Sequence, residues 1–277
     1  MPRVAVFLLP LAFLPNIVDE FVLPKILLAR LLIAVSCVVL LARWLRQGTV
    51  TWKRTPLDLP LLAFIGSAAL STVFAVNHNV AIFGTYDRWE GLLTIVMYAL
   101  VFWLTVQLLS GEPDARGLTW SLLLSGYVIA AVAILQSAFG VLGGGYFHGA
   151  NNIIRPDVTL ANPDFLGIFL AMLLPVAFAK LISSRPITTR VLAANLVVVL
   201  IFGLLATFTR AAWIGAAIGV VMVLVLRRGR FHIWPLAISV LVLVIGFAAL
   251  AGIAAAAKSQ KGTAVGIQEK SAWIESR

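Results

Sequence analysis

The chain has 277 residues, of which 61% are hydrophobic and only 12% are charged, and its mean hydropathy is +1.03. These values exclude an ordinary soluble domain and are typical of a membrane protein that crosses the bilayer several times. A net charge of +10 would suggest nucleic acid as the partner of a soluble protein, but basic residues on a membrane protein chiefly mark cytoplasmic loops and contacts with anionic lipids, so no nucleic-acid partner is expected.

Apolar runs that approach the thickness of a bilayer recur along the chain. They predict an all-α transmembrane bundle of about nine spans, at positions 4–18, 27–41, 57–76, 92–109, 118–139, 165–182, 191–208, 211–226 and 233–257. The first run could instead be a signal peptide, but Pro10 and Pro15 interrupt it and no small-residue cleavage site follows. We interpret residues 1–257 as the membrane bundle and residues 258–277 as the start of an apparently truncated loop outside the membrane.

Basic residues between the predicted spans indicate the orientation. The second span is followed by a basic cluster, and loops rich in Lys and Arg stay in the cytoplasm. Alternation then puts all of the following on that side: Arg43, Arg46, Lys53, Arg54, Arg116, Lys180, Arg185, Arg190, Arg227, Arg228 and Arg230. The N-terminus is expected in the cytoplasm, the first loop with Asp19, Glu20 and Lys25 outside, and the C-terminal tail outside the cytoplasmic membrane.

The predicted outward loop at 77–91, NHNVAIFGTYDRWEG, places Tyr86, Arg88 and Glu90 at a membrane boundary. Aromatic faces and guanidinium groups suit a rim that contacts a carbohydrate or a phosphate. The alternative is an interfacial aromatic belt in which the neighbouring charges pair with one another. Both interpretations stay open at this point.

The longest predicted loop, at 140–161, offers Arg155 and several amides among glycines, either as ligand contacts or as a solvated connector. His148 has no second ligand at metal-binding spacing, and the single Cys37 excludes a cysteine metal cluster, so no metal is expected. Asn162, Pro163 and Asp164 then have the pattern of a helix start, with a polar cap and an acid in the first turn. Such a helix end is also a possible anion site.

The stretch TFTRAAWIG, at positions 207–215, holds a lone arginine, Arg210, where a membrane hairpin should be most apolar. The apolar limbs that separate it from Arg190 and from Arg227 are each about 27 Å long as helix, barely enough to cross a hydrocarbon core of about 30 Å. Arg210 is therefore expected near the far apex of the hairpin. Either it binds an anion in an outward cavity, or its side chain extends to the lipid headgroups.

Four segments, GTYDRWEGL, NPDFLGIFLAMLLP, TFTRAAWIG and the terminal ESR, together resemble the O-antigen ligase and polymerase superfamily. The resemblance extends over most of the chain, which would correspond to the N-terminal part of a family member. Family members usually carry a serine-arginine-glycine turn, whereas this chain has Thr209, Arg210 and Ala211. The arginine is retained and the flexibility of the turn is reduced.

This resemblance implies a GT-C-like membrane glycosyltransferase, of which about nine of an expected twelve or so spans are present. It would transfer a glycan from undecaprenyl pyrophosphate to lipid A core or another acceptor, among membrane lipids and without a cofactor. Arg210 and Arg277 would be catalytic, because two guanidinium groups stabilise the charge that develops on a pyrophosphate leaving group. Substrate contacts are expected from Tyr86, Arg88, Glu90, Arg155, Asn162 and Asp164.

The general-base histidine of the family lies in an outer loop that would follow Arg277, so we expect this chain to hold part of the donor site and to be inactive alone. Three other functions stay open. They are polymerisation of O-antigen, transport of an anion such as bicarbonate, and a structural or assembly role. A transporter needs polar groups at the midplane in matched halves, whereas the charged groups here favour one face.

Overall fold

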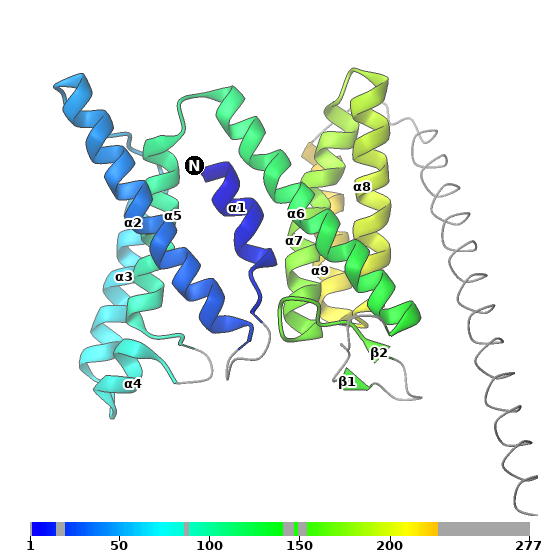
Figure 1. Ribbon diagram of the computed structural model, residues 1–277, viewed down its shortest axis with the longest axis horizontal. Helices are drawn as coiled ribbons and strands as arrows, with labels where there is room; N and C mark the ends of the chain where they lie inside the picture. The colour runs from blue at the N-terminus through cyan, green and yellow to red at the C-terminus, as the bar shows by residue number, and fades with distance from the viewer. Residues whose placement is uncertain (1, 15–19, 86–88, 141–146, 149–153, 227–277) are drawn as a thin grey trace, which may run out of the picture. The chain divides into compact units, whose positions relative to one another are not determined.

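The computed structural model describes residues 2–14, 20–85, 89–140, 147–148 and 154–226 (Figure 1). Within these residues it contains nine helices and one pair of short strands. The helices are α1 (Pro2–Leu11), α2 (Val22–Gln47), α3 (Asp58–Val73), α4 (His78–Phe83), α5 (Leu92–Leu108), α6 (Glu112–Phe139), α7 (Pro163–Ser183), α8 (Ile187–Ala206) and α9 (Arg210–Leu226). Strands β1 (Phe147–His148) and β2 (Ile154–Arg155) pair antiparallel inside the long predicted loop. The all-α prediction is confirmed, with this small addition.

Four helices, α2, α6, α7 and α8, are long and apolar enough to cross a bilayer, with 26, 28, 21 and 20 residues. The prediction of nine spans is therefore wrong for the described part of the chain. Helices α1, α3, α5 and α9 have only 10–17 residues, which correspond to about 15–26 Å, less than a hydrocarbon core of about 30 Å. The reason is that an apolar run can be longer than its helix: α3 ends at Val73, and Asn77 already caps α4 with its side chain. The ninth predicted span, at 233–257, lies outside the described residues.

The chain divides into two compact units, of which the first comprises residues 1–129 and 157–165. In this unit α2 packs against α1 and α5, and α5 also packs against α3 and α4. Lys25 belongs to α2 and not to the preceding loop, which corrects its predicted place. Its ammonium group donates to the carbonyl oxygens of Ala12 (2.8 Å), Phe21 (3.1 Å) and Thr159. One side chain thus joins the end of α1, the start of α2 and the segment before α7.

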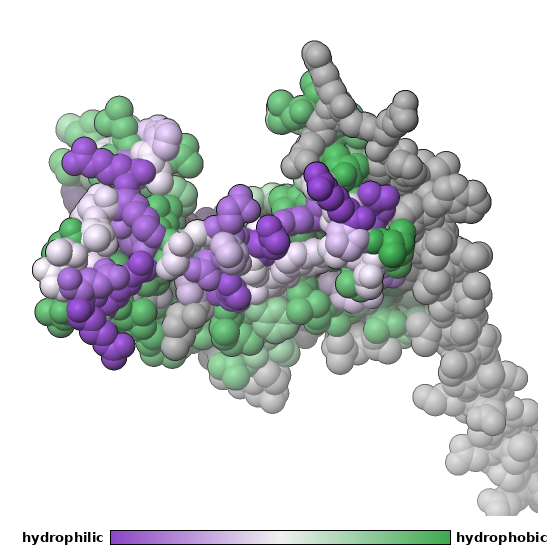
Figure 2. All heavy atoms as spheres, turned by 90° about the horizontal axis from the view of Figure 1, so that it is seen from above, coloured by the Kyte–Doolittle hydropathy of each residue, from purple (hydrophilic) through white to green (hydrophobic). Residues whose placement is uncertain are grey.

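Side-chain bonds to the backbone also hold the basic loop of the first unit. The amide of Gln107, which is buried in the last turn of α5, accepts from the backbone N–H of Lys53 (2.9 Å) and donates to its carbonyl (2.9 Å). The Lys53 ammonium group donates to the carbonyl of Leu109, and Trp52 and Trp103 lie with ring centroids 5.0 Å apart. The loop after α2 and the end of α5 therefore lie together. Figure 2 looks onto this end of the helices, where hydrophilic side chains gather.

The second unit comprises residues 130–156 and 166–277, and α8 lies in its core. Nine residues of α8 are buried, among them Ala193, Ala194 and Gly203. A Cβ atom on Gly203 would lie 2.8 Å from the Cβ atom of Ala130 on α6, so the two helices meet where neither has a larger side chain. In the same way, a Cβ atom on Gly219 of α9 would clash with Pro175 of α7. Small residues let these backbones approach, as is usual for helices in a membrane.

Candidate functional site

The turn between α8 and α9 is the part of TFTRAAWIG on which the site is built. Helix α8 ends at Ala206, and Phe208 has a positive φ of 54°, a conformation that is uncommon for a residue other than glycine. The hydroxyl group of buried Thr207 donates to the carbonyl of Leu204 (2.7 Å) and accepts from the backbone N–H of Thr209 (3.3 Å). These bonds hold the chain in a tight turn, because a strained residue persists only where its surroundings fix it.

Arg155 of β2 binds this turn directly. Its Nε donates to the carbonyl of Thr207 (2.9 Å), and a terminal nitrogen of the same guanidinium group lies 3.3 Å from the hydroxyl oxygen of Thr209. The last carbonyls of a helix have no partner inside it, and a cation is favourable at that end of the helix dipole. Arg155 thus caps α8 and places a positive charge beside the turn. Arg155, one of the predicted substrate contacts, therefore lies beside the turn from which α9 and Arg210 begin.

Arg210 is the first residue of α9, and its side chain is exposed. It makes no side-chain hydrogen bond or ion pair with the rest of the described chain. A cation at a helix N-terminus lies at the positive end of the dipole, where an anion would be stabilised. The guanidinium group of Arg155, the start of α9 and Arg210 therefore gather positive charge beside the turn at residues 207–210. This arrangement favours an anionic ligand.

Two further contacts keep the turn close to its neighbours. A Cβ atom on Gly167 of α7 would lie 2.9 Å from the Cβ atom of Thr209 and 3.1 Å from the hydroxyl oxygen of Thr207, so only glycine lets α7 approach the turn so closely. The indole N–H of Trp213 donates to the carbonyl of Leu204 (3.0 Å), which ties the first turn of α9 back to the end of α8. Both contacts stabilise the position from which Arg210 projects.

Asn162 and Asp164 belong to the first unit and are described with it. The side-chain oxygen of Asn162 accepts from the backbone N–H of Asp164 (2.7 Å) at the start of α7, so the predicted helix cap is confirmed. Glu90, also in the first unit, is exposed and follows Trp89, whose φ is 55°. The described residues on either side of this loop lie close together, because a Cβ atom on Gly84 or Gly91 would clash with the backbone opposite. Tyr86, Arg88 and Arg277 lie outside the described residues.

Within the described residues, no three His, Cys, Asp or Glu side chains gather as in a metal site. His78 lies at the start of α4, with its Nε2 atom 3.2 Å from the carbonyl of Val73. No pattern in the sequence indicates that Arg155 caps α8, because its partners are a carbonyl and a hydroxyl more than fifty residues away. Gly167 is the residue of the sequence that could have indicated this close packing, because it is a small residue in the first turns of α7.

Comparison with models of known protein families, with curated proteins and with solved structures finds no match to this chain.

Proposed function

We propose that this chain takes part in transferring a glycan from undecaprenyl pyrophosphate to an acceptor hydroxyl, and that the turn between α8 and α9 binds the pyrophosphate. On this proposal the chain resembles an O-antigen ligase, and the turn faces the outer side of the cytoplasmic membrane. The observation that carries the proposal is the positive charge at the turn. Arg210 is exposed and has no carboxylate partner among the described residues, and the turn also holds the start of α9 and is bound by Arg155.

The chemistry of the transfer explains why such a turn would help. The oxygen of the acceptor hydroxyl forms a bond to the anomeric carbon of the glycan, and the bond from that carbon to the carrier pyrophosphate breaks. The acceptor proton passes to a base, and the carrier leaves with the bonding electron pair as a more highly charged pyrophosphate. Guanidinium donors that are already in place stabilise this developing charge without reorganisation. Arg210 would supply them directly, whereas Arg155 would chiefly position the turn.

The first test measures binding of undecaprenyl pyrophosphate to the purified full chain in lipid nanodiscs. Hydrogen bonds to charged groups contribute about 1.5–3 kcal/mol, so we expect Arg210→Ala to weaken binding by about tenfold to hundredfold. Arg185→Ala is the matched control, because Arg185 is an exposed arginine of the same unit in the connection between α7 and α8. Equal binding by the wild type and Arg210→Ala would overturn the assignment of the pyrophosphate site.

The second test asks for the transfer itself. The gene that encodes this chain is expressed over its whole reading frame in a strain that lacks its own O-antigen ligase, and glycan attachment is read from the ladder on a gel. We expect attachment to require Arg210, with Arg210→Ala inserted in the membrane to the wild-type level. Attachment that is unchanged in Arg210→Ala would favour a structural role. Uptake of bicarbonate that depends on Arg210, without any attachment, would favour anion transport.

A further inference from the structure

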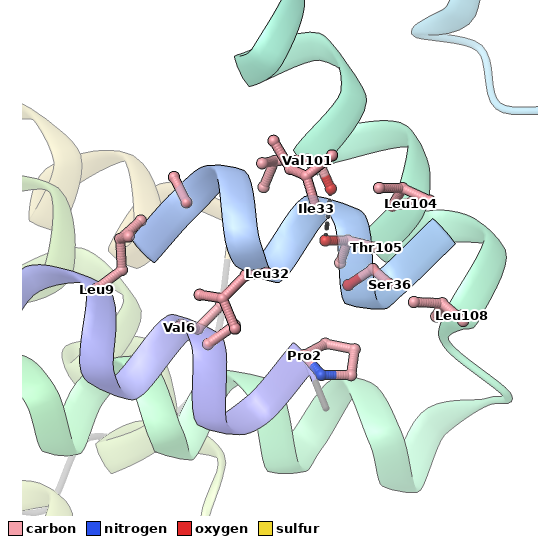
Figure 3. Close-up of a pocket in the computed structure, with 12 residues that line it drawn as sticks. Pro2, Val6, Leu9, Leu32, Ile33, Ser36, Val101, Leu104, Thr105 and Leu108 are labelled. Carbon is pink, nitrogen blue, oxygen red and sulfur yellow. Dashed lines mark hydrogen bonds between the residues drawn. The ribbon is translucent and has the colours of Figure 1, made fainter. Parts of the chain in front are cut away.

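A groove with an apolar lining lies between α1, α2 and α5 in the first unit (Figure 3). It encloses about 70 Å³, and its walls include Val6 and Leu9 of α1, Leu32 and Ile33 of α2, and Leu104 of α5. The hydroxyl group of Thr105, one of the few polar groups in the wall, already donates to the carbonyl of Val101 (2.7 Å) on its own helix. A ligand in the groove would therefore make mainly apolar contacts and hardly any hydrogen bonds.

A larger cavity with charged side chains in its wall lies next to this groove. The cavity has a volume of about 410 Å³, which lies within the range of small-molecule sites, and Pro2 and Leu108 line both spaces. Its charged walls are Arg3 of α1, Arg43 of α2 and Asp114 of α6. All of these residues belong to the first unit. An apolar groove beside a cavity with charged walls suits a lipid, because the groove matches an acyl chain and the cavity matches a charged headgroup.

The charges of the cavity do not balance. Arg3 pairs with Asp114 (2.7 Å) and also donates to the carbonyl of Pro113 (3.1 Å), and its side chain lies against Gly117, where a Cβ atom would clash with it. Arg43 has no carboxylate partner among the described residues and reaches only the hydroxyl oxygen of Ser110, at 3.4 Å. Two guanidinium groups thus face one carboxylate. Among the described residues that line the cavity, one positive charge is thus left without a carboxylate partner.

We propose that the first unit binds an acidic glycerophospholipid, with part of an acyl chain in the groove between α1, α2 and α5 and the phosphate beside Arg43. The phosphate accepts hydrogen bonds from the guanidinium group and balances its charge. An acidic lipid fits better than a zwitterionic one, because a zwitterionic headgroup brings its own cation. A free phosphate would neutralise Arg43 but would leave the groove unfilled. The bilayer around α2 supplies such lipids at high local concentration.

The test compares spin-labelled phosphatidylglycerol with spin-labelled phosphatidylcholine in vesicles that contain the full chain, and measures the motionally restricted fraction of each by electron spin resonance. We expect wild type to restrict phosphatidylglycerol preferentially. A basic residue at a membrane surface changes the affinity for an acidic lipid by about fivefold, so Arg43→Gln should lower the preference by about that factor. Arg46→Gln removes the same charge from an exposed position on α2 that does not line the cavity, and should lower it much less.

A second pair of variants tests the groove. Ala29→Leu narrows it, because Ala29 is part of its wall, whereas Ala34→Leu adds the same volume on an exposed face of α2. We expect Ala29→Leu to reduce the restricted phosphatidylglycerol and Ala34→Leu to leave it unchanged. Equal effects of Arg43→Gln and Arg46→Gln would overturn the site in favour of a general surface potential. Binding of glycerol phosphate that depends on Arg43, with no effect of Ala29→Leu on the lipid, would overturn the lipid as its occupant.

Discussion

A long helix of the first unit, α2, and one of the second, α8, are similarly apolar, but the packing inside the two units differs. The most apolar stretch of α2 has a mean hydropathy of 2.4 and is only 6% buried, whereas that of α8 has a mean hydropathy of 2.2 and is 50% buried. In the first unit, long polar side chains such as Lys25 and Gln107 bind backbone groups of distant segments. In the second unit, small residues such as Gly203 let helices approach closely. Hydropathy therefore identifies a membrane helix but not what it packs against.

The largest loss of stability is expected where the second unit is closest packed. Gly203→Val introduces a branched side chain where even a Cβ atom would lie 2.8 Å from the Cβ atom of Ala130. Overpacking of this kind costs about 3 kcal/mol, which should appear as a lower midpoint of thermal unfolding in detergent micelles. Gly215→Val is the control, since a Cβ atom on Gly215 of α9 meets nothing within 4 Å. Equal losses in the two variants would show that helix propensity and not packing determines the effect.

The corresponding variant of the first unit is Lys25→Met, which keeps the volume of the side chain and removes its ammonium group. Three carbonyl oxygens, those of Ala12, Phe21 and Thr159, lose their donor. Acceptors that lose their donor in a partly buried position are costly, and we expect a loss of about 2 kcal/mol by the same melting measurement. Arg30→Met removes a charge from an exposed position of the same helix and should not lower the midpoint. A midpoint of Lys25→Met at the wild-type value would contradict a stabilising role of the Lys25 ammonium group.

A smaller loss is expected at the turn between α8 and α9. Arg155→Met removes the hydrogen bond to the carbonyl of Thr207 and the positive charge at the end of α8. We expect a loss of about 1–2 kcal/mol from the bond and the helix dipole together. Arg155→Lys keeps the charge without the planar group that reaches both Thr207 and Thr209, and should recover only part of the stability. Full recovery by Lys would reduce the role of Arg155 to its charge.

The sequence predicted well what depends on long apolar runs and local caps. The spans expected at 118–139, 165–182 and 191–208 correspond to α6, α7 and α8 within a few residues, and the cap at Asn162 is present. These features are local, because a helix of this length needs only its own backbone and an apolar surrounding. The number of spans was wrong because an apolar run does not fix where its helix ends, as α1 and α3 demonstrate.

The contacts that build the candidate site could not be predicted in the same way. Arg155 and the turn at Thr207 are 52 residues apart, and Lys25 and Thr159 are 134 residues apart. No periodicity connects such pairs, because their meeting depends on how the helices pack. The position of Arg210 at the start of a helix could be predicted, because it is a lone charge between the apolar runs on either side of TFTRAAWIG. Its lack of a carboxylate partner among the described residues required the structure.

The smallest effect on stability is expected for Arg210→Ala, although its effect on function should be the largest. Arg210 makes no side-chain bond within the described chain, and alanine both favours a helix and removes a cation from its positive end. The free energy of unfolding should therefore stay within about 0.5 kcal/mol of the wild-type value or rise slightly, while undecaprenyl pyrophosphate should stabilise the wild type more than the variant. A clear loss of stability without the ligand would instead mean that Arg210, like Arg155, is part of the structure of the turn. Thermal unfolding of Arg155→Met and Arg210→Ala, each with and without undecaprenyl pyrophosphate, thus distinguishes the residue that stabilises the turn from the residue that binds the ligand.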